Sequence, residues 1–303
     1  MSGVFCCSAS PQFVTVAHGY SDTVLARLIH VSRPVLWVNT IGPTVIGVWL
    51  TGDLWRWDAV ALLLWATLPF NLLIYGVNDI FDQETDALNT RKGGLEGARI
   101  HRSETRAIVV GIVLTNVPFL VYFLVTMPLA ALAWVAAYIV LFVFYSAPPL
   151  RFKARRFLDS LSNAAYAFPL VFVPLALGES PVWAATLGLM AWSVAKHTYD
   201  AVQDIDEDRA VGIRTTAVYL GARGSVVWSG VWWALSTVGF ALVSWPVAIV
   251  NAAIAGWLLL ALWRDATPAT ARRLYRYSIV FPYVAGSVAG SHLVAAILLG
   301  FYP

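Results

Sequence analysis

Long apolar stretches separated by shorter polar ones recur along almost the whole chain. A helix that crosses the hydrocarbon core of a bilayer, about 30 Å thick, needs about 20 predominantly apolar residues. Nine stretches approach that length, and they cover residues 34–51, 58–77, 106–126, 128–146, 161–178, 182–199, 225–243, 246–263 and 277–300. The pattern predicts an all-α fold, a bundle of nine transmembrane helices. Residues 21–303 are expected to form one domain behind a flexible tail of residues 1–20.

Composition and charge placement agree with a membrane location. Of 303 residues, 59% are hydrophobic and only 12% are charged, far below the roughly 25% charged content of soluble domains. All Lys and Arg residues except Arg56 fall on one side of the predicted bundle, and basic residues in short loops mark the cytoplasmic side. The N-terminus is therefore predicted in the cytoplasm and the C-terminus outside. Membrane lipid is therefore an expected partner. Nucleic acid is not, because the topology of the bundle already accounts for the basic residues and the formal charge of +3.

Two of the long cytoplasmic connections carry aspartates at helical spacing. The first aspartate segment holds Asn78, Asp79, Asp82 and Asp86, and the second holds Asp200, Asp204 and Asp208. Positions three or four apart share one face of a helix, so each segment is predicted to present a row of carboxylates. Four predicted spans separate the two segments, which places both rows in the same compartment.

Such rows suit a divalent cation together with a phosphorylated ligand. Oxygen donors without His or Cys at metal-ligand spacing favour Mg²⁺, Mn²⁺ or Ca²⁺ over zinc, and proteins commonly hold Mg²⁺ through one or two carboxylates plus substrate phosphates. Guanidinium and ammonium groups complete a phosphate site. The candidates for diphosphate binding on the same side are Arg151, Lys153, Arg214, Arg91 and Lys92.

Four motifs in this order resemble those of the UbiA superfamily of intramembrane prenyltransferases. They are SRP at 32–34, NDIFDQETD at 78–86, YSAPPLRFK at 145–153, and the segment 200–208 followed by GIRTTA. The resemblance implies a UbiA-like fold with an active site that faces the cytoplasm. It also implies two Mg²⁺ ions, one per aspartate segment, a diphosphate contacted by Arg151 and Lys153, and catalysis that depends on Asp79, Asp82 and Asp204.

Within that superfamily, NDIFDQETDALNTRKGGLEGA at 78–98 is similar to the lycopene elongases of C50 carotenoid synthesis, with Thr90 where those usually have Pro. The resemblance implies dimethylallyl diphosphate as donor and lycopene, or its mono-elongated product, as acceptor. An aromatic or quinone-precursor prenyltransferase is the alternative, and its acceptor pocket would need basic or hydroxyl groups. A divalent-cation transporter would carry acids in both leaflets, whereas only Asp53, Asp58 and Glu179 lie on the outer side.

Ionisation of an allylic diphosphate produces a carbocation, which needs a water-poor cavity with aromatic walls. The sequence offers Tyr75, Tyr145 and Tyr199 near the aspartate segments, together with Asn39, a polar residue inside the first predicted span. No residue identifies itself as the acceptor of the final proton, although His197 precedes the second segment.

Two further patterns concern local packing. Residues 21–31 carry spaced aliphatic side chains after an N-cap candidate, Ser21, which predicts an interfacial helix before the first span. Gly286 and Gly290 have the small-xxx-small spacing typical of helix packing.

Overall fold

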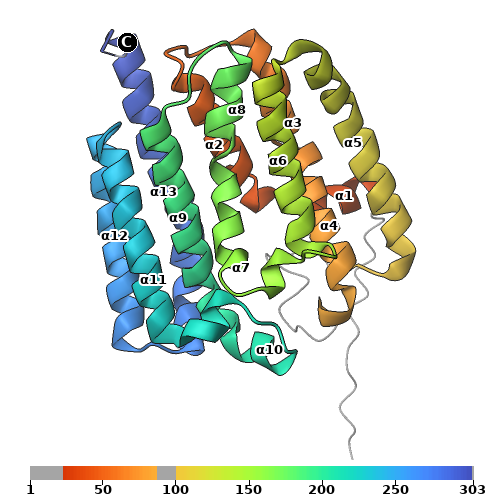
Figure 1. The fold of residues 1–303 in the computed structure, drawn as a ribbon, viewed down its shortest axis with the longest axis vertical. Coiled ribbons are helices and arrows are strands. Elements are labelled where there is room, and N and C mark those ends of the chain that lie inside the picture. Colours follow the sequence, from red (N-terminus) through yellow and green to blue (C-terminus); the bar gives the residue numbers. More distant parts are fainter. Residues whose placement is uncertain (1–22, 87–99, 302–303) are drawn as a thin grey trace, which may run out of the picture.

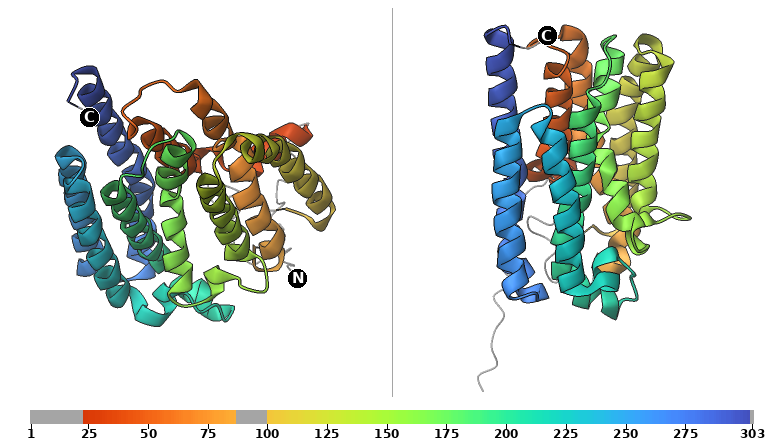
Figure 2. Two further views of the ribbon diagram at one scale, coloured as in Figure 1. Left: turned by 45° about the horizontal axis from the view of Figure 1, so that its top comes forward. Right: turned by 60° about the vertical axis from the view of Figure 1, so that its left-hand side comes forward.

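The computed structural model describes residues 23–86 and 100–301, and in them the chain forms helices packed side by side (Figure 1). Figure 2 shows the long helices running roughly along one common direction. The α-helices are α1 (Val24–Val31), α2 (Val38–Trp49), α3 (Val60–Trp65), α4 (Leu68–Asp86), α5 (Thr105–Thr126), α6 (Leu129–Ser146), α7 (Leu158–Leu161), α8 (Pro169–Ala176), α9 (Trp183–Ala201), α10 (Ile205–Ala210), α11 (Thr216–Ala241), α12 (Trp245–Arg264) and α13 (Pro268–Leu298). The all-α prediction is confirmed for these residues. The predicted tail of residues 1–20 lies outside them.

The predicted count of nine transmembrane helices is not confirmed. Within the described residues, five helical segments are long and apolar enough to cross a membrane: Trp57–Gln83, Arg102–Thr126, Leu129–Ser146, Trp245–Arg264 and Pro268–Leu298.

The remaining predicted spans are helical but less regular. The stretch 34–51 is a 3-10 turn followed by the short α2, and the stretch 161–178 is divided between the 3-10 helix η5 (Ser162–Ala167) and α8. Proline lacks a backbone N–H and clashes with the preceding turn, so Pro169 ends η5 and begins α8. The predicted stretches 182–199 and 225–243 correspond to α9 and α11.

Two clusters of buried apolar side chains divide the bundle into halves. In the first, between α3, α4 and α6, the rings of Phe70 and Tyr138 stack 4.3 Å apart beside Trp65. The second, which includes Trp233 and Leu258, joins α9, α11, α12 and α13. Many apolar side chains on the outer faces of α5 and α11 are exposed, as expected where lipid surrounds a helix.

The two glycines of α13 have different surroundings. A Cβ atom at Gly290 would lie 2.9 Å from Cζ3 of Trp49, so this glycine permits close packing of α13 against α2. A Cβ atom at Gly286 would meet no atom within 4 Å. The packing interpretation is therefore wrong for Gly286, which faces open space.

The helix before the first span begins at Val24, with Thr23 rather than Ser21 as its N-cap. Thr23 Oγ1 accepts a hydrogen bond from the Ala26 backbone N–H at 3.3 Å. An ion pair of 2.7 Å between Arg27 and Glu104 ties α1 to the start of α5. This anchoring fixes where the chain enters α2.

Candidate functional site

A cavity of about 470 Å³ lies between the two halves of the bundle. Its walls come from α2, α4, α6 and η5 on one side and from α9, α12 and α13 on the other. Asn78 of the first aspartate segment and Asp200 and Asp204 of the second line one end, whereas Leu50 and Val247 lie among the apolar residues of the other. The cavity therefore meets the second segment through two carboxylates and the first through Asn78, whereas Asp79 and Asp82 are not among its lining residues. Its size is that of a small-molecule site.

The first aspartate segment lies on α4, as its spacing predicts. The Asp79 side chain is completely buried, and its Oδ1 lies 2.5 Å from Nη2 of Arg33. Asn78 donates a hydrogen bond through Nδ2 to Ser146 Oγ at 3.1 Å. The Asp86 backbone ends α4, and its side chain lies outside the described residues. This segment therefore meets a guanidinium group that comes from just before α2.

Arg33 adopts a left-handed backbone conformation, with φ at 53°. Such a conformation costs a non-glycine residue about 1–3 kcal/mol, and it is concentrated at functional positions. The Arg33 guanidinium lies between the Asp79 carboxylate and the ring of Tyr75, with its Cζ 4.6 Å from the ring centroid. These two contacts hold a positive charge at the polar end of the cavity.

The connection between α6 and α7 supplies further positive charge to α4. Lys153 forms an ion pair with Asp82, and Nη2 of Arg151 lies 3.8 Å from the same carboxylate. Arg151 and Phe157 both have positive φ angles, of 42° and 66°, and they bracket the turns of this loop. The two residues predicted to bind diphosphate therefore lie beside the first aspartate segment.

The second aspartate segment does not form the single helix face that its spacing predicts. The α-helix α9 ends, a 3-10 helix η6 (Val202–Asp204) follows, and α10 then starts at Ile205. Like charges four residues apart repel one another on an α-helix, and the change of helix type separates them. Asp200 and Asp204 line the cavity, whereas Asp208 does not.

The carboxylates of this segment have polar partners. Asp200 accepts hydrogen bonds from Lys196 Nζ and Ser278 Oγ, both at 2.5 Å. Asp208 accepts one from Thr215 Oγ1 at 3.3 Å. Burial, reinforced by the negative charge of Asp204, raises the pKa of Asp208 to about 7. Near neutral pH this carboxyl group therefore changes its protonation state.

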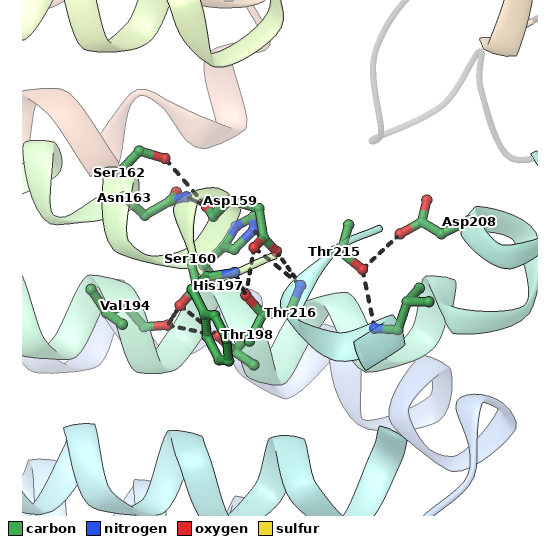
Figure 3. A network of polar contacts seen from close by, with 12 residues as sticks. Asp159, Ser160, Ser162, Asn163, Val194, His197, Thr198, Asp208, Thr215 and Thr216 are labelled. Atoms are coloured by element: carbon green, nitrogen blue, oxygen red, sulfur yellow. Dashed lines mark hydrogen bonds and ion pairs between the residues drawn. The ribbon is translucent and has the colours of Figure 1, made fainter. Parts of the chain in front are cut away.

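A second buried carboxylate, Asp159, joins the cavity wall to α11 (Figure 3). It accepts hydrogen bonds from the Thr216 backbone N–H, at 3.1 and 3.0 Å, and from Thr216 Oγ1 at 2.5 Å, and so it satisfies a free N–H group in the first turn of α11. His197 Nε2 lies 3.7 Å from Asp159 Oδ2 and 3.5 Å from the Tyr145 hydroxyl. Because His197 and Tyr145 line the cavity, Asp159 lies directly behind its wall.

The predicted cavity residues divide into two groups. Asn39, Tyr75 and Tyr145 line the cavity. Tyr199 does not: its hydroxyl donates to the Leu258 carbonyl at 3.1 Å, and its ring packs against Trp233 with centroids 5.3 Å apart. Adjacent residues on a helix point about 100° apart, so Tyr199 faces α11 and α12 while Asp200 faces the cavity.

Arg214, predicted to contact the diphosphate, does not line the cavity that Asp200 and Asp204 line. Gly212, with φ at 74°, turns the chain after α10, and Arg214 then forms an isolated β-bridge with Arg155. It lines a separate surface pocket with Arg155 and Arg156. The predicted residues Arg91 and Lys92 lie outside the described residues.

The donor atoms at the polar end fit a hard cation that arrives with a phosphate ligand. In the ranges 23–86 and 100–301, no three Asp, Glu, His or Cys side chains form a group that could hold a metal by themselves. The buried Nε atoms of Arg33 and Arg151 have no hydrogen-bond acceptor within the same ranges. Carboxylate oxygens beside guanidinium donors that lack an acceptor suit a metal bound jointly by protein and phosphate.

The family model described as UbiA prenyltransferase matches residues 40–300. The chain belongs to the UbiA prenyltransferase family. It is therefore an integral membrane enzyme that transfers prenyl groups.

Relatives and a solved structure extend the comparison of this UbiA-family chain. It is 36% identical over 264 residues to a C50 β-cyclic carotenoid biosynthesis protein of Dietzia sp. (strain CQ4), a match that covers 82% of this chain and 59% of that protein, less than two thirds of it. It is 36% identical over 237 residues to a lycopene elongase/hydratase of Haloarcula japonica, covering 76% of this chain and 79% of that protein. A UbiA homologue from Archaeoglobus fulgidus, solved bound to DMAPP and Mg²⁺, shares the fold with a TM-score of 0.63 at 18% identity, over 86% of this chain and 99% of the other.

Two cations of this UbiA-family site, Arg33 and Lys196, were not predicted as site residues, although Arg33 belongs to the SRP motif at 32–34. Lys196 lies one helical turn before Asp200, and that i,i+4 spacing is a sequence signal for an ion pair. Arg33 and Asp79 are 46 positions apart in the chain, so only the tertiary structure reveals their contact.

Proposed function

We propose that this UbiA-family enzyme is a lycopene elongase, which transfers a dimethylallyl group from dimethylallyl diphosphate to lycopene or to its mono-elongated product. The names of the two relatives at 36% identity support this acceptor, and so does the resemblance of residues 78–98 to that subgroup. The DMAPP-bound state of the Archaeoglobus fulgidus homologue supports the donor. The observation that carries most weight is the cavity, whose charged groups gather at one end while most of the rest is apolar.

The apolar part of the cavity suits the end of a long hydrocarbon acceptor. Pro43 and Ile46 of α2 and Tyr283 and Gly286 of α13 line it, and Gly286 borders open space. A cavity of about 470 Å³ accommodates a ligand of drug size. Only the reacting end of a carotenoid would therefore lie inside, and the rest of the chain would extend between α2 and α13 into the lipid.

The metal-binding roles follow the two aspartate segments. One Mg²⁺ would be held by Asn78, Asp79, Asp82 and Asp86, and a second by Asp200, Asp204 and Asp208. Bound Mg²⁺ supplies Lewis-acid stabilisation of the negative charge that develops on the leaving diphosphate. Among these ligands, transfer would depend most on Asp79, Asp82 and Asp204.

The four cations that pair with these carboxylates would contact the phosphate oxygens. Lys153 and Arg151 reach Asp82, Arg33 reaches Asp79, and Lys196 reaches Asp200. Charge-assisted hydrogen bonds from such groups are about twice as strong as neutral ones. They would hold the donor with its allylic carbon directed into the apolar part of the cavity.

The aromatic walls would protect and stabilise the prenyl cation. Phe142, Tyr145 and Tyr166 line the cavity next to its polar end, and each cation–π contact is worth roughly 0.5–2 kcal/mol. Tyr75 has a different role, because the Arg33 guanidinium already lies over its ring. It would position Arg33 and thereby the diphosphate.

The membrane arrangement completes the proposal. Residues 21–303 would form one domain with nine membrane crossings, in which α2 and the pair η5–α8 count as crossings despite their breaks. The N-terminus and the polar end of the cavity would face the cytoplasm and the C-terminus the outside. The one-sided distribution of Lys and Arg supports this orientation.

Pigment analysis tests the acceptor. When the chain is expressed in cells that make lycopene and dimethylallyl diphosphate, we expect carotenoids that are longer by one and two five-carbon units. Unchanged lycopene, with the protein present in the membrane, would contradict the assignment. Consumption of a polar aromatic acceptor in its place would support the aromatic alternative.

Single substitutions test the metal assignment in the same cells. Asp82→Ala and Asp204→Ala should each abolish transfer. Glu179→Ala, which removes an exposed carboxylate far along the chain from both segments, is the matched control and should retain it. An active D82A/D204A double variant would overturn the metal assignment.

A further inference from the structure

The loop between α6 and α7 carries a second pair of basic residues, which do not reach the cavity. Arg155 and Arg156 line a surface pocket together with Arg214, at the start of α11. We propose that these three arginines, called here the arginine pocket, bind the phosphate of an anionic phospholipid in the cytoplasmic leaflet. This proposal concerns lipid binding and does not depend on the identity of the prenyl acceptor.

The backbone brings the three guanidinium groups together from two separate loops. The β-bridge between Arg155 and Arg214 joins the α6–α7 loop to the segment before α11. The Arg155 Nη2 atom donates to the Pro149 carbonyl at 3.0 Å, and the Arg156 guanidinium lies 5.0 Å from the centroid of the Tyr219 ring. Both side chains are therefore held at the pocket instead of extending freely into solvent.

The described part of the chain provides the arginine pocket with no acidic partner. Within residues 23–86 and 100–301, no ion pair involves Arg155, Arg156 or Arg214, and the residues that complete the lining are Ala154, Val218 and Tyr219. Planar guanidinium groups bind phosphate oxygens through paired hydrogen bonds. The missing partner of this pocket is therefore an anion, and its chemistry is that of a phosphate.

The surroundings favour a lipid over a soluble phosphate. An apolar stripe runs along α11 beyond the break in the helix at Gly221, and its exposed members are Val227, Val231, Leu235 and Val238. Tyr219, which lines the pocket, is exposed just before that break. A phospholipid whose headgroup occupied the pocket could lay its acyl chains along this stripe, whereas a soluble anion would use the arginines alone. Basic groups at the cytoplasmic surface also experience the negative potential of anionic lipids.

A bound lipid would connect the two loops that carry site residues. The α6–α7 loop also holds Lys153, which reaches Asp82, and its Phe157 backbone N–H donates to Thr216 Oγ1 at 2.8 Å. Arg214 follows the second aspartate segment and lies two residues before the start of α11. A phosphate that bound arginines of both loops would hold the two loops together. Figure 3 shows the contact that already joins these parts of the chain, between Asp159 and Thr216.

Lipid binding to the purified full-length chain tests the proposal without any prenyl substrate. The chain in a nonionic detergent is titrated with phosphatidylglycerol and, separately, with phosphatidylcholine of the same acyl chains, and bound lipid is counted by native mass spectrometry. The variant R155Q/R156Q/R214Q removes the pocket. The variant R223Q/R264Q/R273Q removes the same number of basic residues from outside it and serves as the matched control.

We expect wild type and the control to bind phosphatidylglycerol more tightly than phosphatidylcholine. Each arginine near an anionic lipid contributes about fivefold to affinity, so the pocket variant should bind phosphatidylglycerol roughly a hundredfold more weakly. Should the triple variant not fold, R156Q changes one side chain only and should lose about fivefold.

Two outcomes would overturn the proposal. Equal phosphatidylglycerol affinity in wild type, pocket variant and control would show that binding does not use these arginines. In a separate arm, inorganic phosphate and pyrophosphate are titrated into wild type. If either binds as tightly as phosphatidylglycerol and loses that affinity in the pocket variant, the pocket takes a soluble anion and the lipid assignment is wrong.

Discussion

Arg33 combines a left-handed backbone with a buried ion pair, and it connects the chain before α2 to the first aspartate segment. We predict that Arg33→Met destabilises the protein by roughly 3 kcal/mol, because breaking a buried pair leaves a carboxylate without the charge that faced it. Thermal unfolding in detergent micelles measures the effect. Arg56→Met is the control: its partners Asp53 and Asp58 are about half exposed, and exposed pairs contribute at most about 1 kcal/mol. Equal melting temperatures for the two variants would contradict the prediction.

Lys153 should affect the chemistry more than the stability. It lies at Asp82, where the proposed diphosphate binds. Removing one preorganised donor to a developing negative charge typically lowers a rate by about 100-fold or more, so Lys153→Met should lower the initial rate of prenyl transfer by about that factor. Arg223→Met, which removes a basic residue from α11 over the ring of Trp263, should keep the rate. A Lys153→Met enzyme with full activity would remove this residue from the site.

Asp208 predicts a pH dependence. Its pKa of about 7 lies above the ordinary value for aspartate, and Mg²⁺ binds only the ionised carboxylate. Below pH 7 the metal must displace a proton, so the affinity for Mg²⁺ should rise with pH up to about 7 and then level off. Calorimetry in buffers of different ionisation enthalpy should detect proton release at pH 6 and little at pH 8. Asp208→Asn should abolish that difference; identical release at both pH values in wild type would contradict the assignment.

At the scale of elements, the Thr216 hydroxyl group joins the start of α11 to the segment that begins α7. Thr216 Oγ1 donates to Asp159 and accepts from the Phe157 N–H. We predict that Thr216→Val lowers stability by about 2 kcal/mol, because a hydrogen bond to a charged group is worth about 1.5–3 kcal/mol. The matched control is Thr126→Val, whose exposed hydroxyl bonds only to its own helix at Tyr122 in the described structure. Thermal unfolding compares the two, and an unchanged melting temperature for Thr216→Val would show that the network contributes little.

Elements also show how far the sequence determined this site. Spacing correctly predicted that Asp79 and Asp82 share α4, since three-residue spacing on a long apolar helix leaves few alternatives. The same argument did not hold for Asp200, Asp204 and Asp208, because the change to a 3-10 helix depends on local charge and tertiary packing.

The errors at single residues have a related cause. Periodicity indicates which residues share a helix face, but not which neighbour that face meets. Tyr199 is adjacent to Asp200 in the chain and yet faces α12, and Arg214 lies in a matching motif but lines a surface pocket with Arg155. The contact between Arg33 and Asp79 joins distant parts of the chain and has no local signal.

At the scale of the whole molecule, filling the space beside Gly286 should hinder acceptor binding without lowering the stability of the fold. We predict that Gly286→Leu raises the KM for a carotenoid acceptor by about tenfold or more. The added side chain would occupy part of the apolar pocket, and a change of one methylene group in such a pocket alters discrimination by about tenfold or more. Its melting temperature and its KM for dimethylallyl diphosphate should stay unchanged, because the added side chain meets no atom within 4 Å of the first carbon.

Gly290→Leu provides the contrasting control on the same helix. Its added Cβ would lie 2.9 Å from the Trp49 ring, so it should lower the melting temperature. If Gly286→Leu changes the donor KM and the acceptor KM equally, the open space serves the whole cavity and not the acceptor alone.

Three carboxylates of the aspartate segments are already paired with cations before any ligand arrives. Asp79, Asp82 and Asp200 each face a cation, in Arg33, Lys153 and Lys196. A metal alone would meet carboxylates already engaged, and a diphosphate alone would meet engaged cations. When both arrive, carboxylates and cations can exchange partners with little change in net charge, which is the condition for positive coupling between two ligands. The metal and the diphosphate should therefore each bind weakly alone and much more tightly together. The three ion pairs would then separate only when the metal and the diphosphate donor are both bound.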